Sequence, residues 1–292
     1  MASVALEAPK PVSPTWRNFR EALRRHPTAV AGALVLLVMI LVAVLAPWLG
    51  TVDPEAVAPV KRLRQPSAQF WFGSDMMGRD VYSRVLYGAR VSLTVGIAVA
   101  LASTLVGLAI GLVTGFVRWL DAIVMRVMDG LMSIPPVLLA IALMALTRAS
   151  TGNVILAITI SQVPQVTRLV RGVVLSLREQ PFVEAAIAVG TPFFTTLRRH
   201  ILPNTIAPLL VQGTYICASA MITEAILSFI GAGTPPNVPS WGNIMAEGRS
   251  LFQVAYYIVL FPAVFLSVTV LAVNLVGDGL RDALDPRLAR RM

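Results

Sequence analysis

Long apolar stretches separated by short polar segments run through most of this 292-residue chain. The first, residues 28–50, carries no charged side chain and is long enough to cross about 30 Å of hydrocarbon as a helix. Similar stretches follow at residues 91–117, 122–147, 149–167, 205–230 and 253–276. The pattern therefore predicts an all-α polytopic membrane protein with six transmembrane helices.

The composition supports this class and argues against a soluble protein. Only 13% of the residues are charged, against about 25% in an ordinary soluble domain. Mean hydropathy is +0.75. The net charge of +9 resembles that of nucleic-acid-binding proteins, but the arginines lie at the ends of apolar stretches, where the positive-inside rule expects them. We therefore expect contacts with membrane lipid and no nucleic acid partner.

Six spans place both chain ends on the same side of the membrane. With those ends in the cytoplasm, sixteen Lys and Arg residues lie inside and eight outside, six of them in residues 51–90. Arg79, Arg84 and Arg90 lie on the disfavoured side, but the majority favours an N-in, C-in topology. Residues 1–27 are then a cytoplasmic tail, in which Trp16 and Phe19 suggest a short interfacial helix.

In this topology residues 51–90 form a periplasmic or extracellular loop, and residues 278–292 form a second cytoplasmic tail. Residues 91–277 hold the remaining spans. Residues 181–203 form the largest internal cytoplasmic loop, which lies between the fourth and fifth spans.

The sequence of residues 181–203 predicts two short helices joined by a tight turn. Pro181 suits the first turn of a helix, and Gly190 suits the left-handed position that ends one. Thr191 followed by Pro192 predicts a capped restart, and Pro203 is expected to stop the second helix.

The second helix of this pair is amphipathic. Phe193, Leu197 and Ile201 recur on one face, and Arg198 and Arg199 point elsewhere. A helix pair of this kind is more than a connection requires, so we expect a docking site for a cytoplasmic partner.

A few polar or small residues lie within the apolar stretches. Glu224 is either a structural or interfacial carboxylate or a part of a substrate path or gate, and Gln162 and Gln165 beside a proline are either interhelical hydrogen-bonding groups or path residues. Arg126 and Asp129 are spaced to pair on one helical face. The repeat of Gly107, Gly111 and Gly115 predicts close approach of another helix.

The chain lacks the sequence motifs of a self-contained enzyme. It contains no G-x-x-x-x-G-K-[ST], no H-E-x-x-H and no G-x-S-x-G motif, and no spacing typical of metal ligands. We expect no bound cofactor, no metal site and no catalytic residue, and the single cysteine, Cys217, is expected to pack in the core.

Four stretches carry a family resemblance. Glu184-Ala185-Ala186 with Gly190 and Leu202-Pro203 resembles the EAA loop of ABC-importer permeases with the type I transmembrane fold. His200, where the general pattern has isoleucine, is similar to the dipeptide, oligopeptide and nickel branch of that family. Residues 72–93, 227–242 and 274–286 resemble the same branch.

The resemblance implies that this chain is a C-type permease subunit in the bacterial cytoplasmic (inner) membrane. It implies import of dipeptides or oligopeptides with a B-type permease, two cytoplasmic ATP-binding subunits that bind the ATP, and a periplasmic or lipid-anchored binding protein. Residues 181–203, called the coupling loop below, are then the ATPase contact, with these residues in that role: Glu184, Ala185, Ala186, Gly190, Arg198, Arg199, His200, Leu202 and Pro203. The motifs also place Asp75, Arg79, Asp80 and Trp241 as outer-face contacts with the binding protein.

Other readings remain open from the sequence. A nickel or other small-solute importer of the same family fits the motifs equally, because the binding protein selects the cargo. A stand-alone ion-coupled carrier usually shows inverted repeats and broken helices near the midplane, which the pattern does not suggest. A membrane enzyme requires an intramembrane acid–base or metal set that the sequence does not contain.

Overall fold

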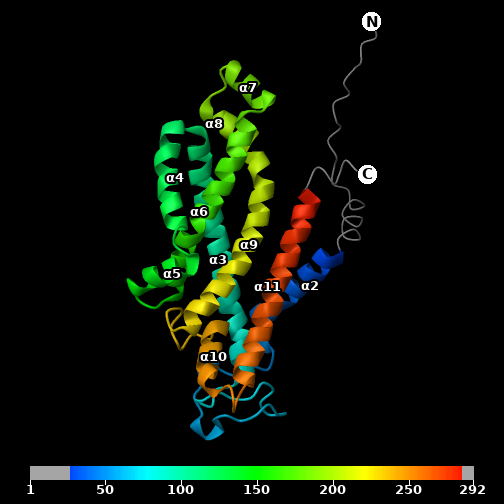
Figure 1. Ribbon diagram of the computed structural model, residues 1–292. Helices are drawn as coiled ribbons and strands as arrows, with labels where there is room; N and C mark the ends of the chain where they lie inside the picture. The colour runs from blue at the N-terminus through cyan, green and yellow to red at the C-terminus, as the bar shows by residue number, and fades with distance from the viewer. Residues whose placement is uncertain (1–26, 285–292) are drawn as a thin grey trace.

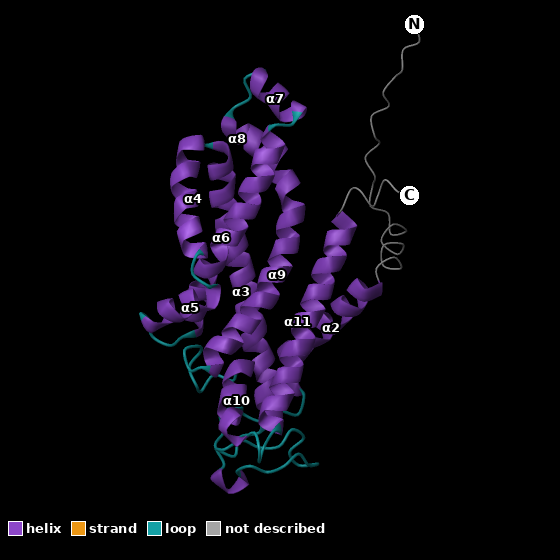
Figure 2. Ribbon diagram, in the orientation of Figure 1, coloured by secondary structure: helices purple, strands orange, loops and turns teal. Residues whose placement is uncertain are grey.

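The computed structural model describes residues 27–284, and within that range the chain consists of helices and loops with no strand (Figure 2). The helices are α2 (Pro27–Leu45), α3 (Val81–Phe116), α4 (Arg118–Met132), α5 (Pro136–Ala145), α6 (Thr151–Arg178), α7 (Pro181–Ala188), α8 (Phe193–Thr196), α9 (Leu202–Phe229), α10 (Trp241–Gly248) and α11 (Tyr257–Leu284). The predicted interfacial helix near Trp16 and Phe19 and the end of the second tail lie outside the described residues.

Four helical segments in the described range are long and apolar enough to cross a membrane: Pro27–Trp48, Val81–Phe116, Phe193–Phe229 and Tyr257–Leu284. The α4–α5 pair makes a fifth if the two helices count as one span. The 28-residue α6 is less apolar, because it carries Gln162, Gln165, Arg168 and Arg171. The all-helical membrane class is confirmed, whereas six spans and the N-in, C-in orientation stay predictions.

Two helices extend beyond the uncharged stretches that predicted them. α3 begins at Val81 and not at residue 91, because the carboxylate of Asp80 caps it by accepting a 2.8 Å hydrogen bond from the amide of Ser83. α11 continues to Leu284, so the first part of the predicted tail at 278–292 is helical. An apolar stretch predicts only the part of a helix that lies in lipid. The polar turns that extend the helix beyond lipid must be predicted from other features, such as a capping residue.

The third predicted span is broken into two helices. α4 and α5 meet at 89°, at the dipeptide Pro135-Pro136. Pro135 is extended, with φ −52° and ψ 132°, because a residue that precedes proline is disfavoured in the α region. Pro136 then starts α5 in the first helical turn, which proline tolerates.

The glycine repeat lets α3 and α6 approach closely, as the sequence predicts. A Cβ atom added to Gly107, Gly111 or Gly115 lies 2.5, 2.7 or 2.7 Å from the Cβ of a valine on α6. These valines are Val166, Val170 and Val174, which repeat at the same interval of four residues. The two helices thus pack glycine against valine over two full turns.

The two ends of the helical bundle are formed by different segments of the chain (Figure 1). α7 and α8 project from one end, where α6 stops and α9 starts, and the start of α2 and the end of α11 point the same way. The opposite end holds the loop between α2 and α3 together with α10. α10 lies between the last two predicted spans, outside every apolar stretch, and the hydroxyl of Ser240 caps this helix by accepting from the amide of Asn243 at 3.2 Å.

Candidate functional site

The first helix of the coupling loop forms and ends as its sequence predicts. Gln180 is extended, and Pro181 lies in the first turn of α7. Gly190 has φ +76°, and its amide donates to the carbonyl of Ile187 at 2.9 Å, while the amide of Thr191 donates to the carbonyl of Ala186 at 3.0 Å. This pair of bonds is the Schellman cap, which needs a left-handed residue at the position of Gly190.

The second helix differs from the prediction at both ends. Thr191 does not cap it; Pro192 occupies the N-cap position, and no side chain caps the helix. Pro203 does not stop it, because a π-helical segment, Leu197–Ile201, joins α8 to α9. The wider π turn brings the amide of Leu202 to the carbonyl of Leu197, and Pro203 then lies in the first turn of α9, where proline is tolerated.

The coupling loop exposes both apolar and charged side chains at the end of the bundle. Val189 and Phe194 are 82% and 79% exposed. Arg198 and Arg199 are also exposed and line a pocket of about 580 Å³ together with Phe194, Thr195 and Pro203. Large exposed apolar residues gathered at one place mark an interaction surface.

The predicted coupling residues do not share one environment. Glu184, Ala185, Gly190 and Pro203 are exposed, as are the two arginines. His200 and Leu202 are half-buried, and the ring of His200 lies 6.1 Å from that of Phe182. Ala186 is buried and faces the chain itself. The structure brings these residues together in one hairpin, with Ala186 on its inner side.

Aromatic contacts hold the coupling loop against the end of α3. The rings of Phe116 and Phe193 lie edge to face, with centroids 4.8 Å apart. The guanidinium of Arg178 lies 5.8 Å from the centroid of the Phe116 ring. It also donates a hydrogen bond of 3.4 Å to the backbone carbonyl of Phe116. Val183 and Ile201 are completely buried. These contacts pack the loop against the ends of α3 and α6.

Two ion pairs join α4 to α6 beside the coupling loop, and the sequence did not predict them. Arg171 binds Asp121 through both carboxylate oxygens, and Arg168 Nη2 lies 2.5 Å from Asp129 Oδ1. The predicted pair of Arg126 with Asp129 is wrong: Asp129 takes its partner from α6. The spacing of residues within α4 pointed to Arg126, but it could not show that Arg168 of α6 is the partner of Asp129.

At the opposite end, Asp75, Arg79, Arg84 and Glu247 form one ionic cluster. Asp75 Oδ2 accepts from Arg79 Nε and Arg84 Nη1, both at 2.6 Å. Arg79 Nη2 lies 2.6 Å from Glu247 Oε2, and Arg84 binds both oxygens of that carboxylate. Asp75 and Arg84 are fully buried. Sequence reasoning missed Glu247, which lies outside the matched stretches, and it gave no role to Arg84, although Arg84 lies within residues 72–93.

The predicted outer-face contacts are mostly interior side chains. Trp241 is fully buried, and its indole Nε1 donates to the carbonyl of Val85 at 3.0 Å. Asp75 and Arg79 belong to the ionic cluster, and Asp80 is half-buried at the start of α3. Within this chain Asp75, Arg79 and Trp241 are buried and join the α2–α3 loop and α10 to the bundle, and their contact with a binding protein stays a prediction.

Glu224 lies at the end of a chain of hydroxyl groups. Its Oε1 accepts from Ser228 at 2.8 Å and its Oε2 from Ser92 at 3.5 Å, and the carboxylate is fully buried. Ser228 lies 3.2 Å from Thr234, which donates to Ser240 at 3.3 Å. The carboxylate thereby anchors residues 231–240 to α9 and α3, an arrangement that favours the structural alternative over the path or gate.

Gln162 and Gln165 occupy different environments on α6. Gln162 is 3% exposed, and its Nε2 donates to Ser219 on α9 at 3.5 Å, while its Oε1 has no partner in the described part of the chain. Gln165 is half-buried. The interhelical hydrogen bond predicted for this pair is therefore present for Gln162. Across residues 27–284 no group of His, Cys, Asp and Glu side chains is arranged to hold a metal ion.

Residues 92–290 match the family model described as the binding-protein-dependent transport system inner membrane component. Residues 14–66 match the N-terminal transmembrane domain of oligopeptide transport permease C. The chain belongs to this family of ABC transporter permeases, multi-pass proteins of the bacterial inner membrane.

Individual relatives agree with that placement. The chain is 56% identical over 268 residues to a probable peptide ABC transporter permease protein of Sinorhizobium fredii, covering 92% of each chain. It is 42% identical over 288 residues to the glutathione transport system permease protein GsiD of Escherichia coli, covering 98% of this chain and 95% of the relative.

A solved structure has a similar fold. The inward-facing structure of the MetNI methionine ABC transporter superposes with a TM-score of 0.57 at 20% identity, covering 69% of this chain and 96% of that chain. The likeness supports the type I ABC-importer membrane fold predicted from the coupling-loop motif.

Proposed function

We propose that this chain is one of two permease subunits of an ATP-driven importer for dipeptides or oligopeptides. Its partners are a B-type permease, two cytoplasmic ATP-binding subunits and a substrate-binding protein on the outer side. The chain itself is non-catalytic and binds no cofactor. The observation that carries this proposal is the coupling loop, an exposed basic and apolar hairpin packed on the ends of α3 and α6.

The proposed orientation follows from that loop. An ATP-binding subunit is cytoplasmic, so the end of the bundle with α7 and α8 is inside, and the α2–α3 loop and α10 are outside. The start of α2 and the end of α11 lie toward the inner end, which supports the N-in, C-in topology (Figure 1). Six spans then require α6, with its polar face against α4 and α9, to cross the membrane as well.

The coupling loop transmits movement by contact. Closure of the ATP-binding subunits would displace α7, and the aromatic contacts of Phe193 with Phe116 would carry that displacement to α3. A contact shifts the equilibrium between the open and closed states only if its strength differs between the two states. The exposed arginines and apolar side chains of the hairpin are suited to such contacts, because an ATP-binding subunit covers them on docking.

Peptides are the proposed cargo because of the names of the relatives. The Sinorhizobium fredii relative is named for peptides and the Escherichia coli relative for glutathione. Nickel import by a permease of this type stays an alternative, since the binding protein selects the cargo. Purified binding protein assayed against a dipeptide, an oligopeptide and nickel separates the two.

Charge reversal at the coupling loop tests the proposed partners. Glu184 is exposed in α7, so Glu184→Lys is expected to lower co-purification of the ATP-binding subunits without preventing membrane insertion. Glu55→Lys makes the same change on an exposed residue of the α2–α3 loop and is expected to leave the complex intact. Equal recovery of the ATP-binding subunits with both variants contradicts the docking assignment.

A further inference from the structure

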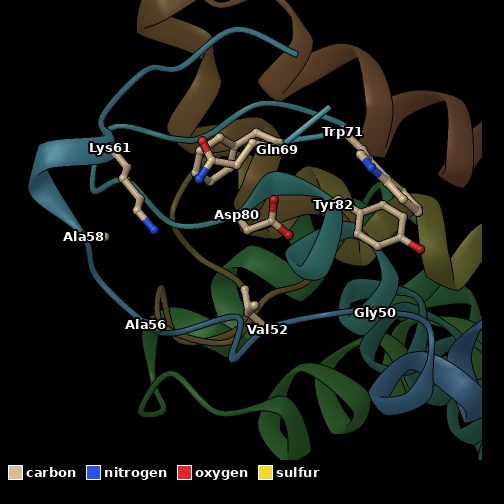
Figure 3. Close-up of a pocket in the computed structure, with 11 residues that line it drawn as sticks. Gly50, Val52, Ala56, Ala58, Lys61, Gln69, Trp71, Asp80 and Tyr82 are labelled. Carbon is tan, nitrogen blue, oxygen red and sulfur yellow. The ribbon is translucent and has the colours of Figure 1, made fainter. Parts of the chain in front are cut away.

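A pocket of about 530 Å³ opens within the loop that joins α2 to α3. Figure 3 shows its lining side chains, which include Lys61, Gln69, Trp71, Asp80 and Tyr82. The volume lies within the range of about 300–1,000 Å³ that is typical of small-ligand sites. Neither the coupling loop nor the buried ionic cluster accounts for this pocket.

Opposite charges face this pocket without neutralising each other. The ammonium of Lys61 and the carboxylate of Asp80 both line it, and no ion pair joins them among the described residues (Figure 3). Asp80 Oδ2 accepts from the amide and hydroxyl of Ser83, at 2.8 and 2.5 Å. Its Oδ1 has no hydrogen bond within the described range, so one oxygen is free for a ligand.

Aromatic rings form much of the remaining wall. Trp71 and Tyr82 lie edge to face with centroids 4.8 Å apart, and Trp71 is 61% exposed. Lys61 Nζ lies 5.8 Å from the centroid of the Phe70 ring. An apolar wall with a few polar groups at fixed places is the usual construction of a site that orients a small molecule.

The wall is held in place by hydrogen bonds between distant parts of the loop. The hydroxyl of Tyr82 donates to the carbonyl of Leu49 at 3.0 Å, and the hydroxyl of Ser83 accepts from the amide of Val52 at 2.9 Å. The buried hydroxyl of Ser74 donates to the carbonyl of Lys61. The backbone positions of both charged residues are thus fixed before any ligand arrives, which lowers the entropy cost of binding.

We propose that this pocket binds short peptides with free termini. Asp80 receives the α-ammonium group, Lys61 receives the α-carboxylate, and one side chain lies against Trp71 and Tyr82. Charge-assisted hydrogen bonds of this kind are roughly twice as strong as neutral ones. The proposal rests on the proposed function for its orientation, in which the α2–α3 loop faces the side from which peptide arrives.

Two unmatched charges of opposite sign favour a free peptide over a segment of the binding protein. An internal segment of a protein chain has neither terminal charge, so it matches Lys61 and Asp80 only where it carries an acidic and a basic side chain at the right places. A free dipeptide has both charges within one small molecule. The site is therefore assigned to peptide that leaves the binding protein, and not to the binding protein itself.

Photo-crosslinking of the assembled transporter in lipid nanodiscs tests the site. The probe is the dipeptide glycyl-p-benzoylphenylalanine, added without binding protein, and the crosslinked peptide is located by mass spectrometry. We expect crosslinks within residues 49–82 that an excess of unlabelled dialanine removes. Crosslinks that fall elsewhere, or that dialanine does not reduce, overturn the proposal.

Two conservative variants assign the charges. Asp80→Asn removes the charge and keeps a residue that caps α3 well, and Lys61→Gln changes an exposed side chain. Each is expected to weaken dialanine competition by about tenfold, the loss of one charged hydrogen bond. Arg62→Gln, an exposed neighbour outside the pocket lining, is expected to leave competition unchanged.

Blocked ligands complete the assignment. N-acetyl-dialanine lacks the ammonium group, so it should bind weakly and should not distinguish Asp80→Asn from the wild type. Dialanine amide should likewise not distinguish Lys61→Gln from the wild type. Equal sensitivity of every ligand to both variants contradicts the charge assignment and indicates a structural effect.

The same preparations separate this site from the proposed function. ATP-dependent uptake with binding protein present and no crosslink in residues 49–82 leaves the importer proposal standing and removes the pocket. A competed crosslink without uptake of any peptide retains the pocket and removes the importer proposal. A crosslink in residues 49–82 that binding protein without peptide blocks, but that dialanine does not reduce, assigns the pocket to protein docking and overturns peptide binding there.

Discussion

Arg84 of α3 and Glu247 of α10, 163 positions apart, form a two-point ion pair, with Nη1 2.5 Å from Oε2 and Nη2 3.0 Å from Oε1. The same guanidinium binds Asp75 of the α2–α3 loop, so one buried side chain joins three parts of the chain. Arg79 joins the cluster from the same loop. In the proposed orientation these two arginines lie on the side that the positive-inside rule disfavours, and each of them is matched by a carboxylate of the cluster.

Removal of the Arg84 charge is expected to destabilise the chain strongly. In Arg84→Met the buried carboxylate of Asp75 and the partly buried Glu247 share only Arg79, and breaking a buried ion pair typically costs about 3–5 kcal/mol. We expect the lower end of that range, because Glu247 is 27% exposed. Thermal unfolding of the protein in detergent measures the loss.

The exposed ion pair of Arg168 with Asp129 supplies the matched control. Its side chains are 51% and 57% exposed, and pairs of this kind are worth about 0–1 kcal/mol. Arg168→Met should therefore shift the unfolding temperature much less than Arg84→Met. Equal shifts in the two variants contradict the structural role assigned to the ionic cluster of Asp75, Arg79, Arg84 and Glu247.

Features determined by local chain geometry were predictable from the sequence. Gly190 ends α7 because only a residue free to adopt positive φ completes the cap, and the cap depends on a few consecutive residues. The glycine repeat of α3 was readable for the same reason, although its valine partners on α6 were not. Local geometry also explains why the third span breaks at Pro135-Pro136, but the 89° angle depends on how α5 packs against α6.

Contacts between segments that are distant in the chain could not be predicted from the spacing of residues along the sequence. Asp129 was matched with Arg126 because those residues share a helix face, but its observed partner Arg168 belongs to another helix. The sequence did not show that Asp75 and Trp241 are buried, because a motif identifies residues without showing which way their side chains face. The π turn before Pro203 has no sequence signal of its own, so the proline was read as a stop.

A methyl group at Gly115 is expected to separate α3 from α6. The new Cβ lies 2.7 Å from the Cβ of Val174, and overpacking of this kind costs about 1–3 kcal/mol. Gly115→Ala should therefore lower the unfolding temperature and the yield of monodisperse protein in detergent. Gly130→Ala is the control, because nothing lies within 4 Å of a Cβ there, and it should be neutral or slightly stabilising.

A compensating change shows whether the effect of Gly115→Ala comes from this contact. Val174→Gly removes the atoms that the new methyl group meets. The double variant should lose less stability than the sum of the two single variants, since residues in contact are not additive. Additive losses indicate that α3 and α6 are not packed through this pair.

A β-branched residue at Gly190 is expected to uncouple the transporter. Its φ of +76° is strained for any side chain, although nothing lies within 4 Å of a Cβ atom, so the cost is in the backbone alone. Gly190→Val should misalign α7 and α8, and peptide uptake and substrate-stimulated ATP hydrolysis should both fall several-fold in proteoliposomes. The expected amount of permease in the membrane is unchanged.

Gly172→Val is the control that separates the effect of a distorted turn from the effect of a larger side chain. Gly172 is exposed in α6, also has open space around it, and has an ordinary helical backbone. Gly172→Val should retain uptake near the wild-type rate. Normal uptake by Gly190→Val removes the coupling assignment of the turn.

Substitutions of Glu224 distinguish the anchor from a path or gate. As an anchor the carboxylate accepts hydrogen bonds from Ser228 and Ser92, and a glutamine of similar shape retains one carbonyl acceptor for Ser228. Glu224→Gln is therefore expected to keep most of the uptake and stability, whereas Glu224→Ala leaves a cavity and unpaired hydroxyls and should lose both, by about 1–3 kcal/mol in stability. Uptake at several peptide concentrations, measured beside thermal unfolding, decides between the roles. If Glu224→Gln abolishes uptake while unfolding is unchanged, the charge itself acts on the transport path, and the anchor is not its main role.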